Sequence, residues 1–176
     1  MNSNEKVIIN HETDYSNALP TVEIITYLVK FCDNLYKQLV SLFEEDEKKN
    51  EQYKEEFKEY KYKKMYSTRF VVRIREKAFN NIECKNYEEF TSAVSNGDLK
   101  QVDKLEIILD LDYKRGRGTN LEEHNNSFVI SFNPYNITFA RKSNKNDSDM
   151  DQIEEQIKKV MDQLPIANSI FCDKGE

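Results

Sequence analysis

Residues 105–114 read LEIILDLDYK, and apolar residues occupy every odd-numbered position of this stretch. The even-numbered positions are mostly charged and include Asp110 and Asp112. Successive side chains of a β-strand point to opposite faces of a sheet, so this alternation predicts a strand with one buried face. Asp110 and Asp112 would then share the polar face with Glu106.

A second stretch, TRFVVRIRE at residues 68–76, alternates in the same way. It places Arg69, Arg73 and Arg75 together on the face opposite its apolar residues. If this strand lies beside residues 105–114, the arginines and the acids pair across the sheet. Each cross-strand pair of opposite charges contributes about 0.2–1 kcal/mol. This hypothesis explains both charged faces without a ligand.

The remainder of the C-terminal region predicts more strands and two helices. Residues 125–132 and 136–143 form an expected hairpin around a turn-rich Asn-Pro-Tyr-Asn segment. Residues 86–97 and 150–164 have the pattern of helices, with Asn86 and an aspartate of residues 144–149 as caps. Hairpin-length connections favour an antiparallel sheet with helices packed on one face, which is an α+β fold.

The N-terminal third divides into a polar lead and a long helical region. We expect residues 1–20 to be a flexible lead, residues 21–65 to be a helical, coiled-coil-like segment, and residues 66–176 to be the α+β domain. Apolar residues recur at steps of three and four between residues 21 and 43. They are Ile25, Leu28, Cys32, Leu35, Leu39 and Leu42.

This stripe must be buried against the rest of the chain or against a second copy, so a homo-oligomer through residues 21–43 is expected. Residues 44–64 are dense in charge and contain good helix formers. They either continue the first helix or form the second arm of a helical hairpin.

Composition limits the functions that the chain can have. The net charge is −6 and charged residues make up 33% of the chain, which argues against bulk attraction to nucleic acid. Three cysteines far apart and two histidines, His11 and His124, give no zinc-ligand spacing. We therefore predict no metal site, no cofactor and no catalytic residue, with both histidines at the surface. An odd cysteine count favours the cytoplasm, and no segment has the pattern of a membrane span.

Five arginines form the candidate ligand-binding set. They are Arg69, Arg73, Arg75, Arg115 and Arg117. Guanidinium groups match the geometry of phosphates and carboxylates. If the acidic strand is not adjacent to the first three, the five together predict a site for an anion such as a nucleotide.

The sequence favours a non-enzymatic binding or regulatory protein, of the accessory kind, that recognises a protein partner or a small anionic ligand. One alternative is a metal-dependent phosphodiesterase or nucleotidyltransferase-like enzyme, because Asp110 and Asp112 could hold one divalent cation. A second alternative is an inhibitor of a nucleic-acid enzyme that presents acidic residues in place of phosphates.

Overall fold

The computed structural model describes residues 7–15, 18, 20–57, 61–76, 81–96, 102–117 and 120–164. These ranges contain both β-strands and α-helices. The elements are β1 (Ile9–Asp14), α1 (Val22–Phe57), β2 (Lys61–Glu76), β3 (Asn81–Cys84), α2 (Tyr87–Asn96), β4 (Val102–Arg117), β5 (Asn120–Phe132), β6 (Ile137–Ser143) and α3 (Ser148–Asp162). Residues 166–172, IANSIFC, could form a last short strand or a tail by sequence, and they lie outside the described residues.

The strands form one antiparallel sheet in the order β1-β6-β5-β4-β2-β3. β4, β5 and β6 follow one another as hairpins, whereas the chain returns from β3 to β4 through α2. With three helices beside this sheet, the predicted α+β class is confirmed.

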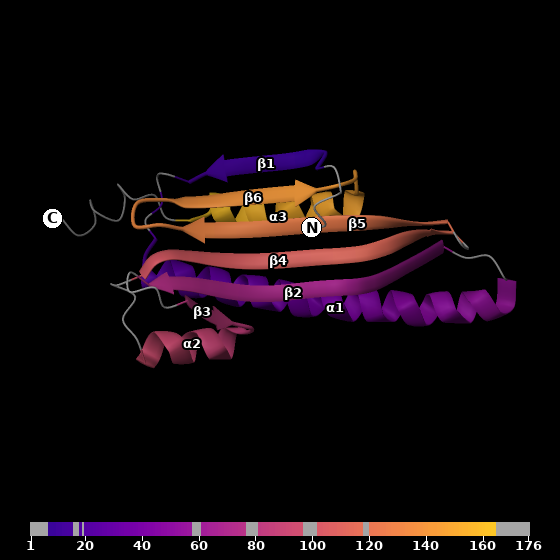
Figure 1. Cartoon of the computed structure of the whole chain (residues 1–176), viewed down its shortest axis with the longest axis horizontal. Helices are drawn as coiled ribbons and strands as arrows, with labels where there is room; N and C mark the ends of the chain where they lie inside the picture. Colours follow the sequence, from indigo (N-terminus) through magenta and orange to yellow (C-terminus); the bar gives the residue numbers. More distant parts are fainter. Residues whose placement is uncertain are drawn as a thin grey trace.

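Within the described part of the chain, the helices leave one face of the sheet uncovered. α1 and α3 both lie behind the sheet in Figure 1, while α2 lies beyond β3 at the lower edge. The odd-numbered residues of β4 from Leu105 to Tyr113 point toward the helices and are at most 2% exposed. The strand pattern that predicted a half-buried β4 therefore also determines which face α1 and α3 cover.

α1 is a single helix of 36 residues, so the charged segment continues the first helix rather than folding back on it. Its apolar stripe packs on the sheet of the same chain, where Leu28 and Val29 are fully buried. Leu42, at the end of the stripe, is 57% exposed. The stripe thus needs no second copy to bury it, and self-association through residues 21–43 stays a prediction.

Two boundaries differ from those expected. β2 begins at Lys61, inside the range that was expected to be helical, and β1 lies within the expected lead. β1 reads INHETD, and among the described strands it pairs with β6 alone. An edge strand that buries little has no strong alternation of apolar residues, which is why its sequence gave no strand signal.

The predicted caps of both C-terminal helices are confirmed. The Asn86 side chain accepts a hydrogen bond from the backbone N–H of Glu89 at 2.8 Å, and the Glu89 carboxylate accepts one from the N–H of Lys85 at 2.7 Å. Asp147 is the N-cap of α3 and accepts from the N–H of Asp149 at 3.0 Å. Both caps satisfy backbone donors that the first helical turn leaves unpaired.

Candidate functional site

The arginines of β2 lie beside the acids of β4 on the uncovered face. Arg69 is the register partner of Asp110, and its Nη2 is 3.0 Å from the Asp110 Oδ2. The hypothesis that these two charged faces pair across the sheet is confirmed for this pair.

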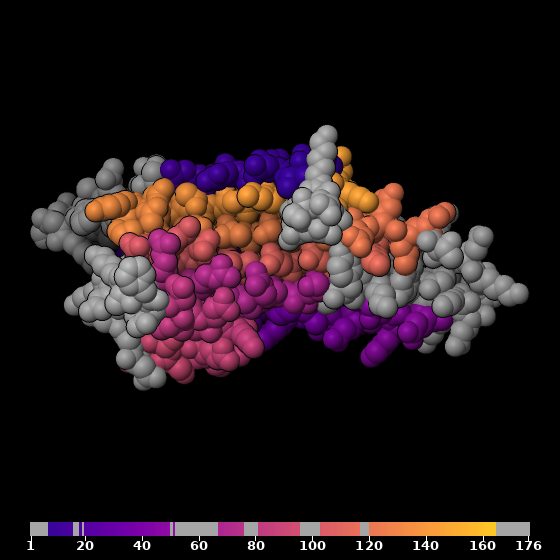
Figure 2. All heavy atoms as spheres, viewed as in Figure 1, coloured from indigo at the N-terminus to yellow at the C-terminus, as the bar shows by residue number. Residues whose placement is uncertain are grey.

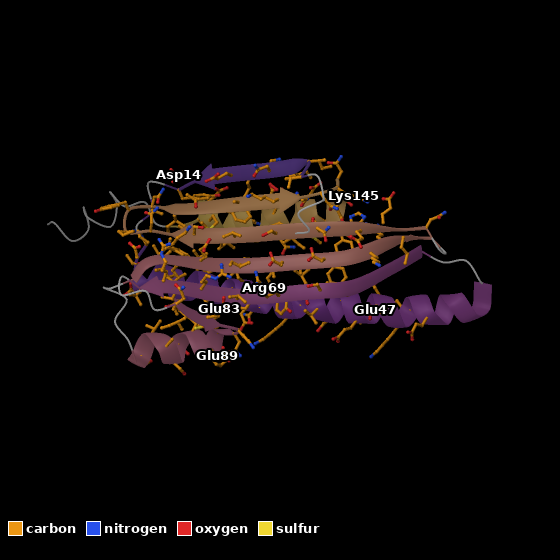
Figure 3. All side chains as sticks on the ribbon, viewed as in Figure 1. Asp14, Glu47, Arg69, Glu83, Glu89 and Lys145 are labelled. Atoms are coloured by element: carbon orange, nitrogen blue, oxygen red, sulfur yellow. The ribbon has the colours of Figure 1, made fainter. Side chains whose placement is uncertain are left out.

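The other two arginines of β2 bind carboxylates that are not directly opposite them. Arg73 reaches Glu83 on β3 at 3.3 Å, and Arg75 reaches Asp103 at 3.2 Å. Figure 3 places Arg69 on β2 and Glu83 on the neighbouring β3. All three guanidinium groups are therefore held along one strand by carboxylates of its two neighbours.

These ion pairs remain accessible to water. The side chains of Arg69, Arg73 and Arg75 are 49%, 39% and 56% exposed. Pairs this exposed contribute about 0.2–1 kcal/mol each to stability. A guanidinium carries five N–H donors, and within the described residues each of these arginines donates one hydrogen bond to a carboxylate. Each arginine is thus oriented by its carboxylate and has capacity to bind further acceptors.

An apolar row crosses the middle of the same face. Val71, Ile108, Val129 and Ala140 are successive cross-strand partners on β2, β4, β5 and β6. We call these four residues the central row. Val71 and Ile108 are only 4% and 6% exposed, whereas Val129 and Ala140 are partly exposed.

Polar rows flank the central row on both sides. One consists of Arg69, Asp110, Ser127 and Lys142, and the other of Arg73, Glu106, Ser131 and Thr138. Figure 2 shows this face of the sheet directly, with β6, β5, β4 and β2 side by side. The uncovered face therefore has an apolar centre and a rim of mixed charge.

The five candidate arginines are not brought together. Arg115 has the same strand parity as the buried Tyr113, so it belongs to the helix-covered face, opposite to Arg69, Arg73 and Arg75. Its Nη1 lies 3.7 Å from Asp147 and 3.6 Å from Asp149 at the start of α3. Arg117 ends β4, and its side chain lies outside the described residues. The condition set for a five-arginine anion site, a distant acidic strand, is not met.

Two of the acids on the polar face of β4 lie beside cations of the protein. Asp110 contacts Arg69, and Glu106 lies 3.8 Å from the Lys104 ammonium. Among the residues that the structure describes, no three His, Cys, Asp or Glu side chains are grouped to hold a metal ion.

A buried polar cluster on the helix-covered face was not predicted. Arg141 is 1% exposed, and its Nη1 bonds both Asp151 and Glu154 of α3. The Glu154 carboxylate also lies 2.6 Å from His11 Nδ1 on β1. Arg141 Nε donates to the Ser143 hydroxyl at 3.1 Å. The cluster links α3 to the last strand and to the edge strand.

The sequence did contain a signal for this cluster. Arg141 falls at the same parity as Ile137 and Phe139, which are core residues of β6. Glu154 directly follows Ile153 in the buried stripe of α3. A charge at a core position on each of two neighbouring elements predicts a buried ion pair, since an isolated buried charge is too costly.

His124 belongs to a second buried polar contact, and the prediction that it lies at the surface is wrong. It is 7% exposed and stacks on Tyr113 with ring centroids 5.0 Å apart. Its Nδ1 lies 3.0 Å from Oδ2 of Asp147, the cap of α3. His11, in contrast, has a side chain that is 56% exposed. The Asp147–His124 contact fixes the start of α3 to the sheet.

Comparisons with known proteins add no assignment, because no family model, curated protein or solved structure matches the chain. None of the helices in the described ranges is long and apolar enough to cross a membrane.

Proposed function

We propose that this chain is a non-enzymatic recognition protein that binds a protein partner through the uncovered face of its sheet. The observation that carries the proposal is the central row with half-exposed arginines beside it. Protein interfaces commonly combine an apolar centre with a polar rim, and arginine is among the residues enriched there. The intramolecular carboxylates orient the arginines before a partner arrives, which reduces the entropy lost on binding.

A protein partner is favoured over a small anion. Arg69, Arg73 and Arg75 each already hold a carboxylate at 3.0–3.3 Å, so a phosphate would compete with the acids of the protein. A protein surface can instead accept hydrogen bonds from the remaining guanidinium donors and cover the central row as well. The proposal also places the protein in the cytoplasm, since Cys32 and Cys84 are free buried thiols.

Site-specific photo-crosslinking in the cells that produce the protein tests this proposal. A photoreactive residue replaces Ala140, in the central row, and in a second variant it replaces Gln156, which is exposed on α3. We expect a discrete crosslinked protein from position 140 and not from position 156. No product from position 140, or equal products from both positions, would contradict the proposal.

A pair of charge variants sharpens the experiment. Arg73→Glu changes the uncovered face, whereas Lys159→Glu makes the same change of charge on α3. We expect Arg73→Glu to abolish the crosslink and Lys159→Glu to preserve it. Lys159 is exposed and the Arg73 side chain is 39% exposed, so circular dichroism and melting temperatures should remain close to those of the wild type.

Thermal-shift measurements test the two other functions. Ligands that bind only the native state raise the melting temperature by mass action. Under the proposal, neither Mn²⁺ and Mg²⁺ nor a panel of nucleotides produces a shift. A metal-dependent shift that Asp110→Asn with Asp112→Asn removes would support the phosphodiesterase-like enzyme instead. A metal-independent nucleotide shift that Arg73→Glu removes would support the anion site.

A further inference from the structure

The outer edge of β1 presents a defined set of backbone groups. β1 is the last strand on its side of the sheet, and Figure 3 shows Asp14 at its end along that edge. The N–H of Tyr15 donates to the carbonyl of Ile137 on β6 at 2.7 Å. Alternate residues of an antiparallel strand direct both backbone groups to the same neighbour. The odd-numbered residues of β1 therefore face β6, and Asn10, Glu12 and Asp14 face outward.

The outward groups are self-complementary about one residue. If two copies of β1 align antiparallel with His11 opposite His11, Asn10 of each copy faces Glu12 of the other. Asn10 and Glu12 both direct their N–H and C=O outward, so these two reciprocal pairs form about four main-chain hydrogen bonds. Ile9 of each copy then lies opposite Thr13 of the other.

Neighbouring registers are less favourable. Centring the pair on Glu12 would set Glu12 against Glu12, and like charges directly opposite each other destabilise a strand pair. Centring it on Asn10 would leave Asn10 as the only outward residue of the strand with a partner. The acids of β1 thus oppose wrong registers, in the way that charges on edge strands commonly prevent unselective pairing.

The regular alternation of β1 ends at Ile9, because the N–H of Ile8 also points to β6 and donates to the Ser143 carbonyl at 3.0 Å. The register centred on His11 is therefore drawn from Ile9–Asp14 alone. Val7 and Ile8 are 40% and 49% exposed and would lie at the ends of the strand pair.

We propose that a second copy of this chain pairs with β1 in the register centred on His11, so that the two sheets join into one continuous antiparallel sheet. This surface is distinct from the stripe of α1, which the sheet of the same chain covers. It is also distinct from the uncovered face. Pairing of two copies through β1 and binding of a protein partner on the uncovered face can therefore fail independently.

Proline substitution tests whether the edge is the interface. The N–H of Glu12 points outward, so Glu12→Pro removes a donor from the edge without removing a β1–β6 hydrogen bond. The N–H of Thr13 points to β6, so Thr13→Pro is the matched variant that damages the sheet itself. In analytical ultracentrifugation we expect a concentration-dependent dimer for the wild type and a monomer of near-normal melting temperature for Glu12→Pro. A wild type that is monomeric throughout, or a dimer that survives Glu12→Pro, would overturn the proposal.

Cysteine crosslinking tests the register. In a Cys172→Ser background, the remaining native thiols, Cys32 and Cys84, are buried. Directly opposite residues of a non-hydrogen-bonded pair have Cβ atoms about 4.5–5.5 Å apart, close to the separation that a disulfide needs. We expect His11→Cys to form an intermolecular disulfide under mild oxidation and Thr13→Cys to form none. The reverse result would refute this register.

Discussion

Replacing Arg141 by methionine should destabilise the protein far more than its place on a charged strand suggests. Arg141 is 1% exposed and the Glu154 side chain is 8% exposed, so the substitution removes a buried cation from beside a buried carboxylate. Breaking a buried ion pair in this way costs about 3–5 kcal/mol. His11 at 2.6 Å and Lys158 at 3.9 Å remain beside Glu154, so we expect the lower end of that range.

The corresponding fall in melting temperature is about 6–12 °C for a chain of this size. Urea unfolding of the wild type and the variant measures the change in free energy directly, provided that the slope of the transition is unchanged. Arg69→Met is the matched control, because its ion pair is half-exposed and should cost less than about 1 kcal/mol.

The double variant Arg141→Met with Glu154→Met decides whether the buried charge is the cause. Replacing both members of a buried pair by apolar residues of similar size is often neutral or stabilising. We expect the double variant to recover to within about 1 kcal/mol of the wild type. If it is as unstable as Arg141→Met alone, the loss arises from packing, and the electrostatic explanation is wrong.

Three further predictions concern the core, the start of α3 and the buried thiol. Leu28→Ala, at a fully buried position, should lower the free energy of unfolding by about 2–5 kcal/mol. Leu42→Ala, at a position that is 57% exposed, should change it by less than about 0.5 kcal/mol. Equal effects in urea unfolding would contradict the packing of α1 described above. Asp147→Ala should lower that free energy by about 1–2 kcal/mol, and Asp147→Asn by less because the amide oxygen still caps α3; an equal loss in both would show that the cap contributes little. Burial, together with the neighbouring Asp33, raises the pKa of Cys32 from an ordinary 9.0 to about 12. As the pH rises, the thiol therefore loses its proton in the unfolded chain before it does so in the folded protein. The free energy of unfolding should fall between about pH 9 and 12. Urea midpoints measured across that range should fall less steeply for Cys32→Ala, and identical slopes would refute the assignment.

The sequence predicted those parts of the fold in which side-chain periodicity and burial agree. Residues 105–114 and 68–76 alternate because one face of each strand is buried. Their opposite charges suggested a pairing if the two strands were neighbours, and the sheet order shows that they are. The cap at Asn86 and an aspartate cap within residues 144–149, which is Asp147, were also predicted, because local chemistry determines helix caps.

The missed features depend on contacts between distant residues. β1 has no periodic pattern because it packs on one neighbour only. Its His11 meets Glu154 across 143 positions of sequence, a contact that no local signal contains. The arginine set failed to come together because Arg115 lies on the helix-covered face of the sheet, opposite to Asp110 and the arginines of β2. Parity along the strand distinguishes these faces, but strand order was needed to know which partners each face meets.

The pairing of β1 with β6 joins the first described strand to the last. During synthesis, β1 leaves the ribosome more than a hundred residues before its only partner in the sheet. At about 5–20 residues per second this delay is on the order of 10 s. β1 can therefore pair with β6 only after nearly all of the described chain has been made, and the nascent chain carries it without this partner until then.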